Sequence, residues 1–202
     1  MKRKISLSRN NTKNQKKLYL ILIGLAIIGF IIGCLFIFIL SKDNNSFIKD
    51  NLTNYFNNIK PSFNLLFKTI FNYFIYIITI WILGISIIGI PIVIFMYLFK
   101  CFILGFSLSS IINSFGFKGI LIALFDLFPH KISFIIVLLL VTFYSVSFSI
   151  KLIKHLFFKR PINFRESMNK YFKILIISLS ISLVISIYEV FISPYLINIF
   201  EK

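Results

Sequence analysis

The residues of this chain that could do chemistry are few, and their spacing does not assemble a catalytic site. A serine nucleophile needs a histidine base within hydrogen-bond reach. Ser107 follows Gly105 and Phe106 inside an apolar run, but the two histidines of the chain, His130 and His155, are expected at opposite edges of a membrane. The sequence has no HExxH, phosphate-binding or dinucleotide-binding motif and no carboxylate pair. We therefore expect no enzyme activity, no cofactor and no metal.

Three ionisable residues lie in or near apolar runs and could serve binding or structure. Lys100 comes nine residues after Pro91, about 13 Å along a helix. Glu189 lies nearer the end of the last run, and Asp126 lies in a short apolar segment that we expect to be near water. A charge inside a bilayer is costly, so each must find a partner or a route to water. A Lys100–Glu189 pair would satisfy both, although their expected depths differ by about a turn and a half.

The composition is that of an integral membrane protein. Of the 202 residues, 58% are hydrophobic and only 14% are charged, with a mean hydropathy of +0.94. Soluble domains average about 45–50% apolar residues. Cys34 and Cys101 lie inside apolar runs, where we expect small buried side chains and no disulfide.

The formal net charge of +16 comes mainly from basic residues beside apolar runs. Basic residues in such places orient a protein in the membrane and attract anionic lipid, so we do not expect nucleic-acid binding. Of the 22 basic residues, 14 lie in two blocks that flank apolar runs. The first block comprises Lys2, Arg3, Lys4, Arg9, Lys13, Lys16 and Lys17, and the second comprises Lys151, Lys154, Lys159, Arg160, Arg165, Lys170 and Lys173.

The apolar runs predict an all-α fold, a polytopic membrane helix bundle with about five transmembrane helices plus short interfacial or half-inserted helices. An uncharged helix over 69–99 would be about 46 Å long, whereas the bilayer core is about 30 Å thick. Gly89-Ile90-Pro91 predicts a corner there, because proline ends helices. We expect a basic cytoplasmic tail at 1–17 and one membrane domain at 18–199. Its spans are expected at about 18–40, 70–88, 91–113, 131–150 and 174–199, the last bent or ended near Pro194.

The segments between the spans have patterns of their own. Apolar residues recur at helical spacing within 41–68, which predicts a short amphipathic helix at the interface. The apolar stretch in 114–130 is too short to span, and we expect an interfacial or half-inserted helix. Gly29 and Gly33 form a GxxxG spacing, which allows close helix packing and would also permit self-association.

The charges favour five crossings. Five crossings place both basic blocks on one side of the membrane, which the positive-inside rule makes cytoplasmic, with the N-terminus inside and the C-terminus outside. The alternative takes 70–99 as one kinked span and 101–130 as a re-entrant hairpin. That arrangement has four crossings and leaves the second basic block outside.

The stretch from Tyr73 to Phe157 resembles the stage II sporulation protein M family. The resemblance rests on a Trp-x-x-Gly-x-Ser-x-x-Gly-x-Pro run followed by Phe-Lys and a later glycine. The residues that carry it are Trp81, Gly84, Ser86, Gly89, Pro91, Lys100, Gly105 and Phe106, followed by Gly116, Gly119 and Pro129. Cys101 departs from the pattern, which has a glycine after the lysine.

The resemblance implies a non-enzymatic scaffold in the mother-cell membrane of the sporulation septum. Its expected partners are stage II sporulation proteins D and P, which degrade peptidoglycan outside the membrane during engulfment of the forespore. Residues 41–68, 114–131 and the C-terminus would then be the outer docking faces. The candidates for structural or partner-binding roles are Gly84, Gly89, Pro91, Lys100, Gly105, Asp126 and Glu189.

A transporter or permease subunit is the alternative function. Broken helices, a Gly-Pro corner and an intramembrane lysine also occur in transporters. A transporter would need a polar cavity at mid-membrane, whereas a bundle centre filled by isoleucine and phenylalanine would count against it.

Overall fold

The computed structural model describes the backbone of residues 2–39, 42–58, 61–158 and 163–195. Within these ranges it describes the side chains of 15–39, 46–54, 61–124, 129–157 and 163–195. The side chain of Asp126, residues Lys159 and Arg160, and the last part of the predicted fifth span, 196–199, lie outside the described residues.

The described residues are almost all helical and include no strand. Five helices are long and apolar enough to cross a bilayer. This confirms the predicted all-α membrane bundle. The helices are α1 (Lys2–Phe36) with a 3-10 turn η1 (Ile37–Ile39), α2 (Lys42–Asn58), α3 (Phe63–Ile85), α4 (Gly89–Ile122), a π-helix η2 (Ala123–Ile132), α5 (Ser133–Phe158), α6 (Phe164–Ile187) and a second π-helix η3 (Tyr188–Ile192).

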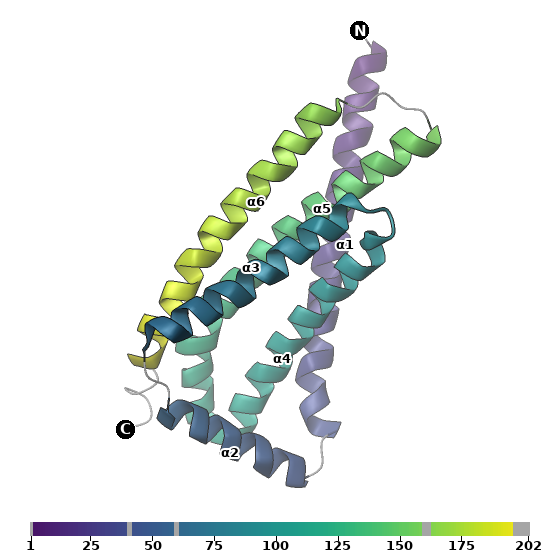
Figure 1. Ribbon diagram of the computed structural model, residues 1–202. Helices are drawn as coiled ribbons and strands as arrows, with labels where there is room; N and C mark the ends of the chain where they lie inside the picture. Colours follow the sequence, from purple (N-terminus) through teal and green to yellow (C-terminus); the bar gives the residue numbers. More distant parts are fainter. Residues whose placement is uncertain (1, 40–41, 59–60, 159–162, 196–202) are drawn as a thin grey trace.

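The helix ends separate into two groups (Figure 1). The N-terminus, the α3–α4 turn and the facing ends of α5 and α6 lie at one end of the bundle, which we name the basic end. Helix α2 lies across the opposite end, near the α4–η2 junction and the end of η3; we name this the α2 end. The segments of the two basic blocks that the structure describes therefore lie at the same end of the bundle.

The α3–α4 turn is tight and uncharged. Helix α3 ends at Ile85 and α4 begins at Gly89, so the break lies at 86–88, just before the expected corner. The Gly89 N–H donates to the Ser86 carbonyl at 3.2 Å. A Cβ atom at Gly89 would collide with the Leu83 carbonyl, so only glycine fits there. Pro91 lies in the first turn of α4, where its missing N–H costs no helical hydrogen bond.

The connection from α4 to α5 differs from the separate half-inserted helix expected at 114–130. The chain kinks at Gly116, whose φ of 59° and ψ of −130° favour glycine. It then stays helical through η2 and enters α5 without interruption. Pro129 does not end this helix because it lies within the π-helical segment, whose wider turn accommodates the missing donor.

Helices α1 and α4 cross at very short range. A Cβ atom at Gly33 would collide with the Phe102 carbonyl, and one at Gly105 would collide with the Phe30 carbonyl. The Cys34 Sγ donates to the Gly105 carbonyl at 3.4 Å across this contact. The GxxxG face of α1 is thus occupied by α4 within the same chain, and a second copy would need another face.

The centre of the bundle is filled by aliphatic and aromatic side chains. The outward faces of the helices also carry large apolar side chains, as expected of surfaces in contact with lipid. The main buried cluster includes Ile77, Ile80, Val93, Tyr97, Cys101, Phe134, Val137, Leu138 and Val141.

Candidate functional site

A polar cluster lies between α3, η2 and η3, toward the α2 end. We name it the Glu189 cluster; it comprises Glu189, Lys131, His130 and Tyr73. The Lys131 Nζ lies 3.0 Å from the Glu189 Oε1, and the His130 Nε2 lies 3.8 Å from the same oxygen. The Tyr73 hydroxyl donates to the other oxygen, Oε2, at 2.5 Å. Both carboxylate oxygens are therefore occupied, by groups from two other segments, α3 and η2.

The cluster is largely withdrawn from the surface. The Glu189 side chain is 18% exposed and the His130 side chain 3%, while Lys131 is 39% exposed. Tyr73 is buried and stacks on Phe134 with ring centroids 4.1 Å apart. A carboxylate at this depth is tolerable because a cation and a hydroxyl compensate for its lost hydration.

Two π-helical segments bring the cluster together. His130 and Lys131 lie in η2, which contains Pro129, and Glu189 lies in η3, shortly before Pro194. Each proline removes a backbone donor from its helix, and the wider turn re-aims the side chains around it. In lipid such local adjustments are the means by which a proline is accommodated in a span.

Lys100 does not belong to the Glu189 cluster. Its Nζ lies 4.4 Å from the centroid of the Tyr76 ring, and the Tyr76 hydroxyl donates to the Met96 carbonyl at 2.5 Å. Glu189 directs its ion pairs to Lys131 and His130 instead. The partner of this half-buried cation is therefore the face of an aromatic ring, an interaction that strengthens as water is excluded.

The C-terminal end of α3 forms a second polar site. The Ser145 hydroxyl donates to the Ile80 carbonyl at 3.1 Å, and the Tyr171 hydroxyl donates to the Trp81 carbonyl at 2.7 Å. The Ser149 hydroxyl donates to the Gly84 carbonyl at 2.5 Å. Gly84 lies in the last turn of α3, where carbonyls have no partner within the helix and in a membrane must find one elsewhere, whereas Ile80 and Trp81 lie one turn earlier and gain an additional hydrogen bond. Side chains of α5 and α6 supply these donors.

Gly84 permits this close approach. A Cβ atom there would collide with the Ser145 and Tyr171 side chains. Trp81 lies one turn earlier and stacks on Tyr171 with ring centroids 5.3 Å apart, and Tyr171 stacks in turn on Phe148 at 4.8 Å. The Trp-x-x-Gly spacing of the sequence thus places an aromatic ring and an open backbone on the face that meets α5 and α6.

The predicted residues do not converge on one site. Gly84, Gly89 and Pro91 shape the end of α3 and the start of α4, Gly105 admits α1, and Lys100 and Glu189 lie in separate contacts. The sequence analysis missed the partners of these residues, which are Tyr73, Lys131, Ser149 and Tyr171. One signal was usable, because Lys131 and Glu189 fall near the same membrane edge in adjacent antiparallel spans.

The described side chains of both sites bond to other parts of the same bundle. Among the residues with described side chains, no three His, Cys, Asp or Glu residues come close enough to hold a metal ion. The Glu189 carboxylate is engaged by Lys131, His130 and Tyr73, and the hydroxyls of Ser145, Ser149 and Tyr171 donate to backbone carbonyls. These contacts join α3 to α5 and α6, and join η3 to α3 and η2.

Comparison with known proteins places the chain in a family. The family model of stage II sporulation protein M matches residues 22–194, which take in most of each apolar span and both polar sites. No curated protein and no solved structure matches the chain. Since this match covers most of its length, the chain belongs to the stage II sporulation protein M family, membrane proteins of sporulation.

Proposed function

We propose that this protein is a non-enzymatic membrane scaffold that holds peptidoglycan-degrading partners at the septal membrane during engulfment of the forespore. The observation that carries the proposal is the amphipathic helix α2, which lies across one end of a bundle matched by the sporulation family (Figure 1). The expected partners are stage II sporulation proteins D and P.

The α2 end is the side that we propose to face the cell wall. Lys151 and Lys154 near the end of α5 and Lys173 near the start of α6 belong to the opposite, basic end, where these two helix ends lie, and cytoplasmic membrane flanks are enriched in lysine and arginine. Wall hydrolases act outside the membrane, so a scaffold must present its docking surface there. The orientation and the docking role support each other.

Helix α2 packs against the bundle through Leu52 and could serve as a docking platform. Leu52 packs against a small apolar cluster formed by α4 and η2, which includes Ile111, Ile122 and Ala123. Most of its other described side chains are exposed, Lys49 and Asp50 among them. An element anchored by its apolar face presents its polar face at fixed positions, which reduces the ordering cost of binding.

The filled centre of the bundle favours a scaffold over a transporter. A transporter holds its substrate near mid-membrane, between helices that can separate. Here Ile77, Ile80, Val93, Leu138 and Val141 occupy the centre and are fully buried. The polar Glu189 cluster borders this core at one end, where Tyr73 stacks on Phe134.

The test is affinity purification of the tagged protein from sporulating cells, with mass spectrometry of the co-purifying proteins. We expect cell-wall hydrolases in the eluate and a deletion strain that stalls in engulfment, followed by membrane staining. Absence of the hydrolases together with completed engulfment in the deletion strain would refute the proposal.

A surface variant localises the docking face. Exchanging the charges of α2 by Lys49→Glu and Asp50→Lys should leave protein levels unchanged and remove the hydrolases from the eluate. Lys173→Glu is the matched control, because it reverses an exposed charge at the basic end. If the hydrolases are lost with the control but not with the α2 variant, the docking face lies at the basic end and the proposal is wrong.

A further inference from the structure

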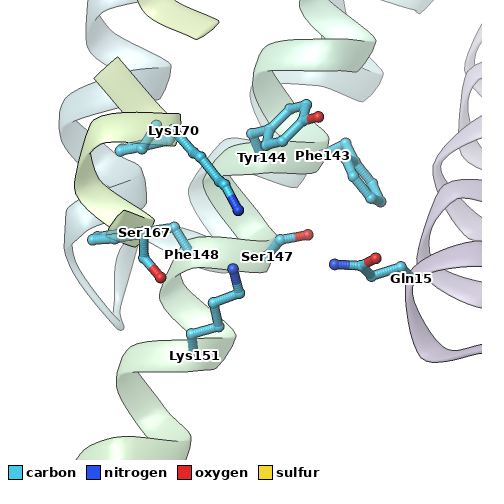
Figure 2. Close-up of a pocket in the computed structure, with 9 residues that line it drawn as sticks. Gln15, Phe143, Tyr144, Ser147, Phe148, Lys151, Ser167 and Lys170 are labelled. Carbon is cyan, nitrogen blue, oxygen red and sulfur yellow. The ribbon is translucent and has the colours of Figure 1, made fainter. Parts of the chain in front are cut away.

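A polar pocket opens between α1, α5 and α6 at the basic end. It has a volume of about 340 Å³, and its polar lining consists of Gln15, Tyr144, Ser147, Lys151, Ser167 and Lys170. Figure 2 shows the two lysine amines directed toward each other from α5 and α6, with Gln15 reaching in from α1. We name it the basic-end pocket. Neither the scaffold role nor the Glu189 cluster uses it.

The charge of the pocket suits an anion. Lys151 and Lys170 contribute two positive charges, while Glu166 lies beside them and pairs with the Lys170 Nζ at 2.7 Å. These three groups sum to +1. The Glu166–Lys170 pair is exposed on both sides, and such pairs contribute little to stability, so Lys170 can exchange it for another anion at small cost.

The depth of the pocket suits a lipid headgroup. On each of the three helices the change from charged to apolar sequence falls at this level, after Lys17 on α1, before Lys151 on α5 and after Lys173 on α6. Boundaries of this kind mark the headgroup region of a bilayer. An anion held between Lys151 and Lys170 would therefore lie where lipid phosphates lie.

An apolar groove adjoins the pocket and suits an acyl chain. The groove has a volume of about 470 Å³ and is lined by Gln15, Lys16, Tyr19, Leu20 and Phe143. Gln15 and Phe143 line both spaces, and Tyr19 and Phe143 meet edge to face with centroids 6.0 Å apart. A ligand crossing from one to the other would have a negatively charged head and an apolar tail.

We propose that the basic-end pocket binds the headgroup of an anionic phospholipid, with one acyl chain in the adjoining groove. Lys151 and Lys170 hold the phosphate, and the Ser147 and Ser167 hydroxyls and the Gln15 amide supply further donors. The lipid ties α1 to α5 and α6 at the membrane surface. Basic pockets between transmembrane helices on this side of a membrane are suited to anionic headgroups.

The experiment is native mass spectrometry of the full-length protein in detergent, titrated with phosphatidylglycerol or with phosphatidylcholine of the same chain length. We expect one phosphatidylglycerol to be retained at least tenfold more tightly than phosphatidylcholine. Lys151→Gln and Lys170→Gln should each weaken retention about fivefold. Glu166→Gln should strengthen it, because the change removes the competing carboxylate.

Controls separate this site from general attraction to a basic surface. Lys173→Gln removes the same charge from the same region but does not line the pocket, and it should leave retention unchanged. Circular dichroism and gel filtration of each variant check that it is folded. Equal retention of the two lipids, or no loss in the Lys151→Gln/Lys170→Gln double variant, would overturn the proposal. Displacement of the lipid by millimolar inorganic phosphate would overturn it too, by showing a site for free phosphate instead.

Discussion

The hydroxyl of Tyr171 in α6 donates a hydrogen bond of 2.7 Å to the backbone carbonyl of Trp81 in α3. The two side chains also stack, so a single tyrosine contacts both the ring and the backbone of the same residue. This contact joins the last spanning helix to the second one, 90 residues earlier in the chain.

The hydroxyl can be removed without the ring. Tyr171→Phe keeps the stacking and leaves the Trp81 carbonyl without its partner from α6. We expect a loss of about 1 kcal/mol in unfolding free energy. Trp81 is the single tryptophan of the chain, so its fluorescence during denaturation in detergent reports this contact. Tyr144→Phe, at an exposed site on α5, should have no effect; equal losses would mean that the hydroxyl of Tyr171 contributes nothing specific.

The α1–α4 crossing predicts a contrast among glycines. Gly33→Ala and Gly105→Ala force the two backbones apart and should each destabilise the protein by about 1–3 kcal/mol. A Cβ atom at Gly24 on α1 would meet nothing within 4 Å, so Gly24→Ala should leave stability unchanged or raise it. Thermal unfolding in detergent measures all three. Similar midpoints for the three variants would show that the crossing tolerates separation.

Breaking the Glu189 cluster should be costly. Glu189→Gln leaves Lys131 and His130 facing a neutral amide, and we expect a loss of about 1.5–3 kcal/mol. Glu166→Gln also removes an ion pair, but an exposed one, and should have a clearly smaller effect. Chemical denaturation of both variants gives the comparison. If Glu166→Gln proves the more destabilising change, the cluster does not fasten η2 to η3.

The pairing of Lys100 with Tyr76 can be measured by a double-mutant cycle. Lys100→Met removes the cation and Tyr76→Leu removes the ring, and we expect a coupling of about 0.5–2 kcal/mol between them. In a second cycle, Tyr76→Phe keeps the ring but loses the hydrogen bond to Met96. Because the phenylalanine ring still faces Lys100, the coupling measured in this cycle should be small. Zero coupling in the first cycle would show that the contact between Lys100 and the Tyr76 ring does not stabilise the protein.

The proposed orientation predicts which end a membrane-impermeant maleimide reaches. In a background without Cys34 and Cys101, Asn51→Cys on α2 should be labelled in intact cells. Lys173→Cys at the basic end should be labelled only after the membrane is opened. Both positions are exposed in the structure, so their accessibility differs only by side. The reverse pattern would invert the bundle and with it the proposed docking face.

Much of the architecture could be predicted from single residues whose effect is local. Proline and glycine indicated the turn before Pro91, and Gly29 and Gly33 indicated a close helix contact. Apolar spacing indicated a short helix within 41–68, which the structure has at Lys42–Asn58. Each of these features depends on a few neighbouring residues. The π-helices were not predictable in this way, because Pro129 could have ended a helix as readily as widened it.

The polar sites depend on which helix faces meet. Glu189 lies 58 residues from Lys131 and 116 from Tyr73, and nothing in one sequence specifies their rotation about the helix axes. The need of each charge for a partner suggested pairing Lys100 with Glu189, although their expected depths differed, and packing gave each residue a different partner. The donors at the end of α3 were hidden for the same reason, because one sequence does not say which serines of α5 face α3.

The turn at 86–88 also bears on how the protein is made. With only three residues between α3 and α4, neither helix can enter the bilayer and wait for the other, so the pair must insert as one hairpin. The turn carries no charged residue that would keep it on one side of the membrane during insertion. The basic blocks before and after must therefore set the direction of the hairpin, and the order of synthesis gives the first block precedence.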